Sequence, residues 1–286
     1  MPKPTTNPIR NGFLAALLAT LSTINTACVT NPATGRDQIN YLSKSAEIRL
    51  GQQAAQQAVP AYGGELQNTA INQYVDRVGN AIAQQVEPFY QDLPWEFTVL
   101  DTPDVNAFAL PGGKIFITRG LLAQMNSEAE LAGVMGHEVA HVTAEHHDLA
   151  AQRQLALAGV SIVGAITAEQ LDSEIGTVAA QAFVTGAGLF ALSYDRRQEH
   201  ESDKLGLRYM TAAGYNPNGL LSVMQTLDRL SPNADGTDWT STHPNPGDRA
   251  QTISTLIDQR YADLANSPDA IIGAAAYQST VLNNLN

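Results

Sequence analysis

The sequence predicts a predominantly helical α+β domain that contains a small β-sheet. Apolar residues recur every four positions over 66–86, they alternate with polar residues over 95–99 before a hairpin pattern at 106–118, and a capping box at Ser127 opens a further helix. With 286 residues, 44% hydrophobic and 15% charged, the chain is long enough to bury one large core. We therefore expect a single domain over residues 43–286.

The first 27 residues are typical of an export leader. Lys3 and Arg10 supply positive charge, and the apolar run Phe13–Leu21 is too short to span a bilayer as a stable helix. The small residues before Cys28 resemble a bacterial lipoprotein signal, in which the cysteine is lipidated and becomes the mature N-terminus. The alternative is ordinary leader cleavage that leaves Cys28 as a free thiol. Both interpretations predict export, and lipidation predicts a periplasmic protein anchored to the outer membrane.

Composition limits the partners and the kinds of site. Cys28 is the only cysteine, so an intrachain disulfide and a cysteine metal cluster are both excluded. The formal net charge of −12 becomes −14 without the leader, because Lys3 and Arg10 leave with it and no acidic residue does. Such an acidic chain disfavours nucleic acid as a partner. Residues 28–42 are polar and rich in turn residues, and we expect them to tether the domain to a membrane anchor.

Two amphipathic helices are expected next. The first runs from about Ser45 to Val59 and is rich in alanine and glutamine. The second runs from about Leu66 to Val86, with one apolar face made by Tyr74, Val78, Ile82 and Val86. We expect both helices to serve packing.

A short β region follows. Trp95, Phe97 and Val99 alternate with polar neighbours, and the runs 106–110 and 114–118 flank a Pro-Gly-Gly turn, which predicts a hairpin. An edge strand of such a hairpin can bind a substrate peptide by backbone pairing, and small side chains allow close approach. The alternative is simple sheet structure. The residues expected to form a substrate-binding strand are Asn106, Ala107, Phe108 and Ala109.

The helix that begins after Ser127 contains the stretch Gly-His-Glu-Val-Ala-His over 136–141, and we expect it to continue past His147. Residues 155–193 are apolar and rich in glycine and alanine. Their apolar runs are too broken for a transmembrane helix, so we expect two packed helices, with a membrane-facing or mobile flap as the alternative.

The HExxH stretch places three chemical groups around one point. Positions four apart on a helix lie about 40° apart around the axis and roughly 6 Å apart along it, so His137 and His141 can both bind one zinc ion. Glu138 is rotated by about 100°, beside the metal, where it can accept a proton from a water molecule. The alternative is a helix with two solvated histidines.

A catalytic zinc needs a third protein ligand. Glu145 lies about 12 Å along the axis from His137 and is expected to be solvated. His147 nearly completes the metzincin pattern HExxHxxGxxH, but Ala144 replaces the glycine that breaks the helix, so we expect a straight helix that carries His147 away.

The remaining candidates are Glu199 and Asp203. They are four positions apart on one predicted helix face, so one carboxylate can bind zinc while the other accepts the N–H of a ligating histidine. Glu201 is on the opposite side of that helix and is expected to point to solvent. The alternative is an ordinary charged helix face.

Several separated motifs together resemble the HtpX-like and CAAX-prenyl-protease family of zinc metallopeptidases. They are the run 106–113, HExxH, the later Glu-x-x-x-Asp, and Asn-Pro-Ala-Thr-Gly-Arg at 31–36, which is similar to the soluble periplasmic lipoprotein branch. The resemblance implies a zincin-type domain with the sheet along the cleft. It assigns one Zn²⁺ to His137, His141 and Glu199, with Asp203 as the supporting aspartate.

The same family has a His-Pro element with an arginine six residues later, similar to His243, Pro244 and Arg249 here. The resemblance places His243 near the metal, either as a fourth ligand that closes the site or as a donor to the developing oxyanion. The alternative is a loop histidine before a helix.

These expectations amount to a zinc-dependent metalloendopeptidase. A zinc ion would lower the pKa of a bound water toward about 7, and Glu138 would accept its proton and return it to the leaving amine. We expect the substrates to be unfolded or misassembled proteins of the cell envelope. One alternative is a periplasmic chaperone or assembly factor with a closed or little-used zinc site, and another is a metal-binding lipoprotein without hydrolytic activity.

Overall fold

The computed structural model describes residues 28–39, 43–147, 194–230 and 239–285. The leader predicted over 1–27 and the whole apolar region predicted over 155–193 lie outside these ranges. Among the described residues, no helix is both long and apolar enough to cross a membrane.

The described part is mostly helical with two small sheets, which confirms the predicted α+β class. The strands are β1 (Cys28–Thr30), β2 (Asp37–Ile39), β3 (Glu96–Leu100), β4 (Ala107–Leu110) and β5 (Lys114–Thr118). The helices are α2 (Lys44–Ala61), α3 (Thr69–Ala83), η2 (Pro111–Gly113), α4 (Arg119–Leu122), α5 (Glu128–Thr143), α9 (Arg196–Ala212), α10 (Asn218–Leu230), α11 (Trp239–Thr242), α12 (Pro246–Arg260), α13 (Ala262–Ala265), α14 (Ala274–Thr280) and η5 (Leu282–Asn284).

The larger sheet has the strand order β3-β5-β4. β3 pairs with β5 in parallel and β4 pairs with β5 in antiparallel register, with Phe108 opposite Phe116. The predicted hairpin is confirmed, and its turn is η2, in which Gly112 has a φ of 71° that glycine adopts without strain. Among the described residues, β4 is therefore one of the two edge strands of this sheet, and β3 is the other.

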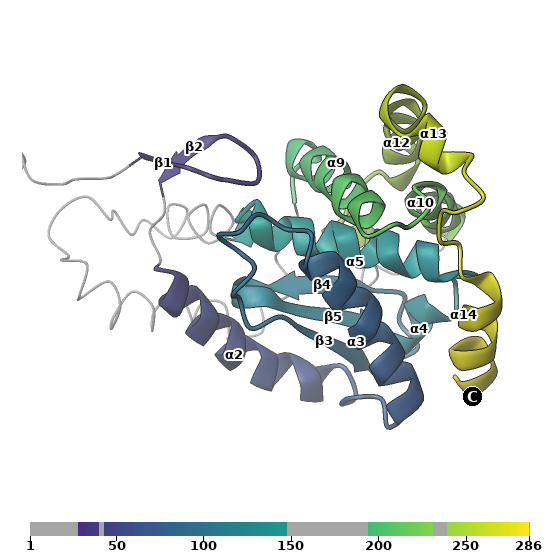
Figure 1. The fold of residues 1–286 in the computed structure, drawn as a ribbon. Coiled ribbons are helices and arrows are strands. Elements are labelled where there is room, and N and C mark those ends of the chain that lie inside the picture. The colour runs from purple at the N-terminus through teal and green to yellow at the C-terminus, as the bar shows by residue number, and fades with distance from the viewer. Residues whose placement is uncertain (1–27, 40–42, 148–193, 231–238, 286) are drawn as a thin grey trace, which may run out of the picture.

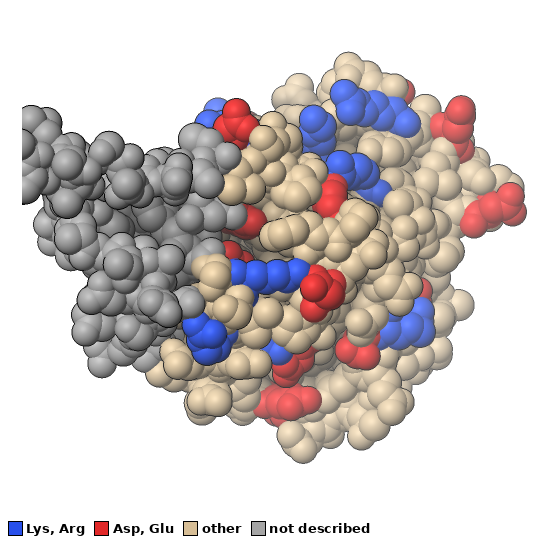
Figure 2. Space-filling view, turned by 60° about the vertical axis from the view of Figure 1, so that its left-hand side comes forward, with Lys and Arg blue, Asp and Glu red and all other residues tan. Residues whose placement is uncertain are grey.

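α5 lies between the sheet and the helices α9 and α10, and α3 packs against both α5 and β3 (Figure 1). The predicted apolar face of α3 is buried, with Val78 and Ile82 fully covered. The Asn68 side chain caps α3 by accepting the backbone N–H of Ile71. Figure 2 shows acidic and basic side chains interspersed over the face that it displays.

The crossing of α5 and α9 brings their backbones unusually close. A Cβ atom on Gly136 would lie 2.9 Å from the carbonyl oxygen of Gly206, and a Cβ on Gly206 would lie 2.9 Å from the backbone nitrogen of His137. Both distances are below normal contact, so only glycine fits at either position. This close approach brings the histidines of α5 next to the carboxylates of α9.

The segment predicted to be a tether contains a folded hairpin. β1 and β2 are antiparallel, and the Asn31 side chain in the connecting turn donates to the carbonyl of Thr143 and to the hydroxyl of Tyr90, both at 3.0 Å. The prediction of a tether over 28–42 is therefore corrected for residues 28–39, which pack against the C-terminal end of α5.

The prediction that the HExxH helix runs past His147 is wrong. α5 ends at Thr143, and Glu145 has a φ of 54°, the left-handed conformation that reverses a helix end. Glu145 is also not solvated as predicted, because it is 6% exposed and accepts hydrogen bonds from Gln38 and Tyr90. These tertiary contacts outweigh the helix propensity of Ala144.

Candidate metal centre

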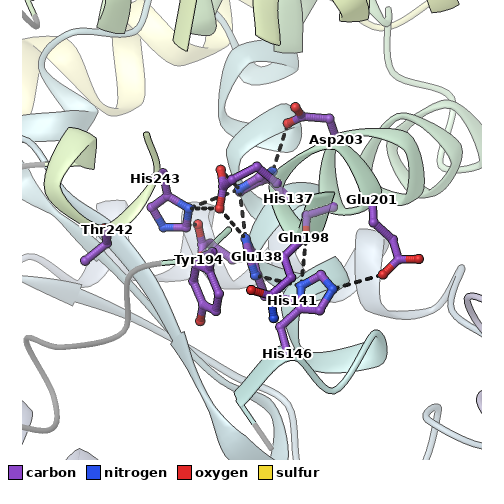
Figure 3. A network of polar contacts seen from close by, with 12 residues as sticks. His137, Glu138, His141, His146, Tyr194, Gln198, Glu201, Asp203, Thr242 and His243 are labelled. Carbon is purple, nitrogen blue, oxygen red and sulfur yellow. Dashed lines mark hydrogen bonds and ion pairs between the residues drawn. The ribbon is translucent and has the colours of Figure 1, made fainter. Parts of the chain in front are cut away.

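Four buried side chains from three segments converge in the interior. His137 and His141 come from α5, Glu199 comes from the first turn of α9, and His243 follows α11 directly. One donor atom from each lies within 4.8 Å of all the others. Figure 3 shows His243 approaching from the opposite side to His141.

The donor atoms have the spacing that a tetrahedral zinc ion requires. His137 Nε2 lies 3.0 Å from His141 Nε2 and 3.2 Å from His243 Nδ1, and His243 Nδ1 lies 3.0 Å from Glu199 Oε1. Glu199 Oε1 lies 3.4 Å from His141 Nε2. A tetrahedron with zinc–ligand distances of about 2.0–2.2 Å has edges of roughly 3.3–3.6 Å, and the four separations lie within or slightly below this range, so the residues fit zinc after small shifts of the side chains.

Local sequence places each donor. The Ser127 hydroxyl accepts the Glu130 N–H at the start of α5, although the Glu130 carboxylate accepts from Asn126 and not from Ser127 itself. α9 begins with a complete capping box made by Asp195 and Gln198, which fixes its first turn. Glu199 follows at once and is 1% exposed.

The aspartate predicted to support the metal contacts a predicted ligand. Asp203 Oδ1 lies 3.0 Å from His137 Nδ1, which leaves Nε2 of that ring free to face the other donors. Arg249 of α12 holds the same aspartate in a fork, with Nε and Nη2 at 2.9 and 2.6 Å, while Nη1 lies 2.5 Å from Glu199. Burial acts to raise the pKa of Glu199 and of Asp203, but Arg249, together with the neighbouring histidines, outweighs it, and both pKa values are lowered.

The pKa values of the two α5 histidines move in opposite directions. Burial, the strongest influence on His137, acts to lower its pKa, but hydrogen bonds to Asp203 and Glu199 prevail and raise it to about 9. Burial is also the strongest influence on His141, and it holds the pKa of this histidine well below the usual value. A deprotonated ring nitrogen is what a metal ligand needs, and His141 offers one at neutral pH.

Glu138 lies beside the donors and is not one of them. It is fully buried, and neither of its carboxylate oxygens has a hydrogen-bond partner in the described part of the chain. His243 lies next to it, with Nε2 3.6 Å from Oε1 of Glu138. Burial raises the pKa of Glu138. A carboxylate with a raised pKa and free lone pairs has the properties of a general base.

Two candidate ligands from the sequence lie elsewhere, as does Glu201, which was expected to point to solvent. Glu145 is held by the N-terminal hairpin, and His147 Nδ1 lies 3.0 Å from the Tyr194 hydroxyl, so neither belongs to the four-donor group. Glu201, predicted to point to solvent, has its side chain 20% exposed and contacts His146 and Arg36. The prediction that Glu201 points to solvent was wrong, because the direction of a side chain on an isolated helix does not show which other segments pack beside it.

The predicted substrate-binding strand coincides with β4, but its alanines do not face outward. Ala107 and Ala109 are 0% and 1% exposed and belong to the main hydrophobic core, so they cannot provide open space beside a bound peptide. Phe108 is partly exposed and stacks on Phe116, with ring centroids 5.0 Å apart. Asn106, just before the strand, is buried and pairs through its backbone with Thr118.

Sequence reasoning missed three aromatic rings around the site. Tyr194 lies against His141 with ring centroids 3.8 Å apart, and Trp239 stacks on His243 at 4.0 Å. His146 contacts His141 from the side away from the donors, with 3.0 Å between the two Nδ1 atoms. Only His146, next to HExxH, carried a sequence signal, and the expectation of a straight helix concealed it.

Comparison with known proteins agrees with this geometry. The model of peptidase family M48 matches residues 69–257, which contain all four donors and Glu138. The chain is 31% identical over 231 residues to "Mitochondrial metalloendopeptidase OMA1" of Schizosaccharomyces pombe, covering 80% of this chain and 66% of that protein.

Two bacterial relatives are also similar. Over 212 residues the chain is 31% identical to "Putative beta-barrel assembly-enhancing protease" of Vibrio cholerae, covering 71% of this chain and 42% of the relative. Over 224 residues it is 25% identical to "Beta-barrel assembly-enhancing protease" of Escherichia coli, covering 77% and 45%. The match thus covers about two thirds of the length of the yeast relative and less than half of the length of the two bacterial relatives. With a family match over most of its length, the chain belongs to peptidase family M48, whose members are zinc metallopeptidases.

Proposed function

We propose that this protein is a zinc metalloendopeptidase that cleaves unfolded or misassembled proteins of the cell envelope. The observation that carries the proposal is the convergence of His137, His141 and Glu199 in a buried group. Beside it lies the carboxylate of Glu138, which has no hydrogen-bond partner in the described part of the chain. Membership in family M48 supports the hydrolytic activity. The assignment to the HtpX-like lipoprotein branch and to a zincin-type fold is part of the same proposal.

The residues of the chain divide the chemical work between them. When bound, zinc supplies a Lewis acid that polarises the scissile carbonyl and makes water more acidic. Glu138 accepts the proton of the attacking water and returns it to the leaving amine. Asp203 holds the ring of His137 through Nδ1.

His243 acts in this proposal as the fourth ligand, which closes the site. Its Nδ1 lies 3.2 Å from His137 Nε2 and 3.0 Å from Glu199 Oε1, close enough to share one metal ion with these donors, and this favours the closing role over that of an oxyanion donor. In this proposal the arrangement with His243 in place is a resting form, and catalysis requires that His243 withdraw to admit substrate.

The substrate class rests on two supports. Relatives named as beta-barrel assembly-enhancing proteases have 25% to 31% identity to the chain, and β4 is an edge strand that can pair with an extended peptide. The pattern of residues 1–27 supports export, and Cys28 supports lipid anchoring. Palmitate labelling that disappears in Cys28→Ala is the expected result, and labelling that persists contradicts the anchor.

The decisive variant for the mechanism is Glu138→Gln. It should keep zinc, because Glu138 is not a donor, and lose cleavage of casein by about 10²–10⁴-fold, the usual contribution of general acid–base catalysis. Zinc content is measured by elemental analysis and cleavage by peptide release. Glu65→Gln, at an exposed glutamate, is the control and should cleave normally. Unchanged cleavage by Glu138→Gln would remove the proposed mechanism.

A second candidate is an assembly factor that binds envelope proteins and uses the zinc site rarely. The specific observation in its favour is the four-donor arrangement, which leaves no position for water in a tetrahedral zinc site while His243 is in place. The same Glu138→Gln variant separates the candidates in cells that lack the protein. Full rescue of envelope stress by this variant supports the assembly factor, and failure to rescue supports the protease.

A further inference from the structure

The ring of His141 has a neighbour on the side away from the donor group. Its Nε2 faces the other donors, while its Nδ1 lies 3.0 Å from Nδ1 of His146. The other nitrogen of His146, Nε2, lies 3.0 Å from Glu201 Oε2. Figure 3 shows the row from His141 through His146 to Glu201. Ser202 Oγ is 3.3 Å from His146 Nδ1, within reach of a second, longer hydrogen bond.

This geometry fixes where the protons lie when His141 binds a metal. A ligating imidazole gives the lone pair of Nε2 to the metal, so the proton of His141 is on Nδ1 and is donated to Nδ1 of His146. His146 then carries its own proton on Nε2 and donates it to the carboxylate of Glu201. Both hydrogen bonds point the same way, from the ligand toward the carboxylate.

The two ligating histidines of α5 are thus supported in different ways. His137 donates directly to a carboxylate, that of Asp203, at 3.0 Å. His141 reaches a carboxylate, that of Glu201, only through the ring of His146. Such partners fix the orientation of a ligating ring and raise its basicity.

Glu201 is in turn fixed by the N-terminal hairpin. Arg36 Nη2 lies 2.6 Å from Glu201 Oε2, and the two side chains are 29% and 20% exposed. The turn that carries Arg36 is closed by the bond from the Asn31 N–H to the Arg36 carbonyl, and the Asn31 side chain donates to the carbonyl of Thr143. The stretch 31–36 therefore contacts both the end of α5, at Thr143, and Glu201, the carboxylate that is linked to His141 through His146.

The end of α5 explains why His146 can reach His141. In a straight helix, positions five apart point in directions about 140° apart. The left-handed conformation of Glu145 reverses the chain and returns His146 to the ring of His141. Glu145 itself is held there by Gln38 of β2 and by Tyr90.

We propose that His146 is a positioning residue for the metal ligand His141, and that the ion pair of Arg36 and Glu201 links the N-terminal 31–36 turn to metal affinity. The inference rests on zinc binding at the donor group, but it does not require proteolysis. In this inference the Asn-Pro-Ala-Thr-Gly-Arg stretch over 31–36 stabilises the zinc site and does not serve only as a tether.

The test measures zinc dissociation constants of the full chain by competition with a chromophoric chelator. His146→Ala should weaken zinc binding by about 10–100-fold, the usual effect of removing the partner of a ligating histidine. His146→Asn should recover part of this loss, because its amide oxygen can take the place of Nδ1 as acceptor. Arg36→Ala should weaken binding in the same direction by a smaller factor.

The matched control is Arg208→Ala. Arg208 also pairs with a glutamate, Glu87, and lies on α9 without contact to His146. Its removal should leave zinc affinity unchanged. Circular dichroism of each metal-free variant checks folding, and the visible spectrum of the cobalt-loaded chain should change in His146→Ala, because the orientation of a ligand has changed.

The outcomes test separately the positioning role of His146 and the effect of the Arg36–Glu201 ion pair. Zinc affinity of His146→Ala equal to wild type overturns the positioning role, and equal losses in Arg36→Ala and Arg208→Ala overturn the link to the hairpin. Equal affinities and cobalt spectra for His146→Asn and His146→Ala, both weakened, overturn the hydrogen-bond basis. Zinc binding by a wild-type chain that cleaves nothing would contradict the proposed function and leave this inference intact.

Discussion

At the scale of single residues, Arg249 connects the proposed metal ligand Glu199 to the C-terminal helices. It is 1% exposed and its guanidinium contacts two carboxylates, those of Glu199 and Asp203. Burial acts to lower the pKa of Arg249, but the two carboxylates outweigh it and raise the pKa above its usual value. The planar fork of arginine suits this bidentate geometry, and lysine cannot reproduce it.

Removing this arginine should destabilise the metal-free protein strongly. Arg249→Leu leaves two buried carboxylates without their arginine counter-charge, and breaking a buried ion pair in this way costs about 3–5 kcal/mol. Arg249→Lys should lose less, because the charge remains. Urea denaturation of the chelated protein measures both variants, and a loss below about 1 kcal/mol in Arg249→Leu would show that the carboxylates find other partners.

At the scale of elements, α5 is fixed at both ends by distant segments. At its start, Glu128 accepts hydrogen bonds from the hydroxyls of Tyr74 and Tyr215 at 2.5 and 2.8 Å and from Arg77 at 2.9 Å. A carboxylate in the first turn also interacts favourably with the helix dipole. At its end, the side chain of Asn31, which lies outside the helix, donates a hydrogen bond to the Thr143 carbonyl. The last carbonyls of a helix have no partner within it.

The start of α5 should make stability depend on pH in the acid range. Burial acts to raise the pKa of Glu128, but Arg77, Tyr74 and Tyr215 together lower it below its usual value. A lowered folded-state pKa means that the contribution is complete above the unfolded value of about 4.3 and is lost as the pH falls through the folded value.

Glu128→Gln should therefore lose about 1–3 kcal/mol at pH 7, the effect of a charge-assisted hydrogen-bond network, and the difference from wild type should shrink below about pH 4. Unfolding free energies from urea titrations between pH 3 and 7 measure this. Glu65→Gln is the control, since Glu65 is exposed. A difference that stays constant across this range would assign the loss to packing and not to charge.

At the scale of the whole molecule, the centre forms only where three segments meet. α5 supplies two histidines, α9 supplies Glu199, and the residue after α11 supplies His243. The approach of α11 is fixed by two backbone bonds, from Trp239 to the Val105 carbonyl and from Tyr194 to the Thr242 carbonyl. The segment 239–243 therefore extends from Val105, just before β4, to the four-donor group.

Removing the fourth donor should open the site. If His243 closes the centre, His243→Ala retains zinc on three ligands and cleaves casein faster, on the order of tenfold for a site that is closed nine-tenths of the time. His200→Ala, at a histidine of α9 outside the donor group, should cleave at the wild-type rate. Abolished turnover with zinc still bound would instead assign His243 the role of oxyanion donor.

The features that follow from local spacing could be predicted from the sequence. Residues four apart on a helix share a face whatever surrounds them, so the sequence pairs His137 with His141 and Glu199 with Asp203. The same rule predicts the buried face of α3, and the Pro-Gly-Gly turn predicts the hairpin of β4 and β5.

Only the tertiary structure decided how these local pieces meet. The break at Glu145 opposes the propensity of Ala144 and depends on Gln38 and Tyr90, which are about 100 and 55 residues away in sequence. The partner of His141 is therefore His146 and not a carboxylate, and Glu201 faces that ring and not solvent. Helix propensity and spacing act over a few residues, whereas these outcomes depend on contacts between distant segments, which periodicity does not encode.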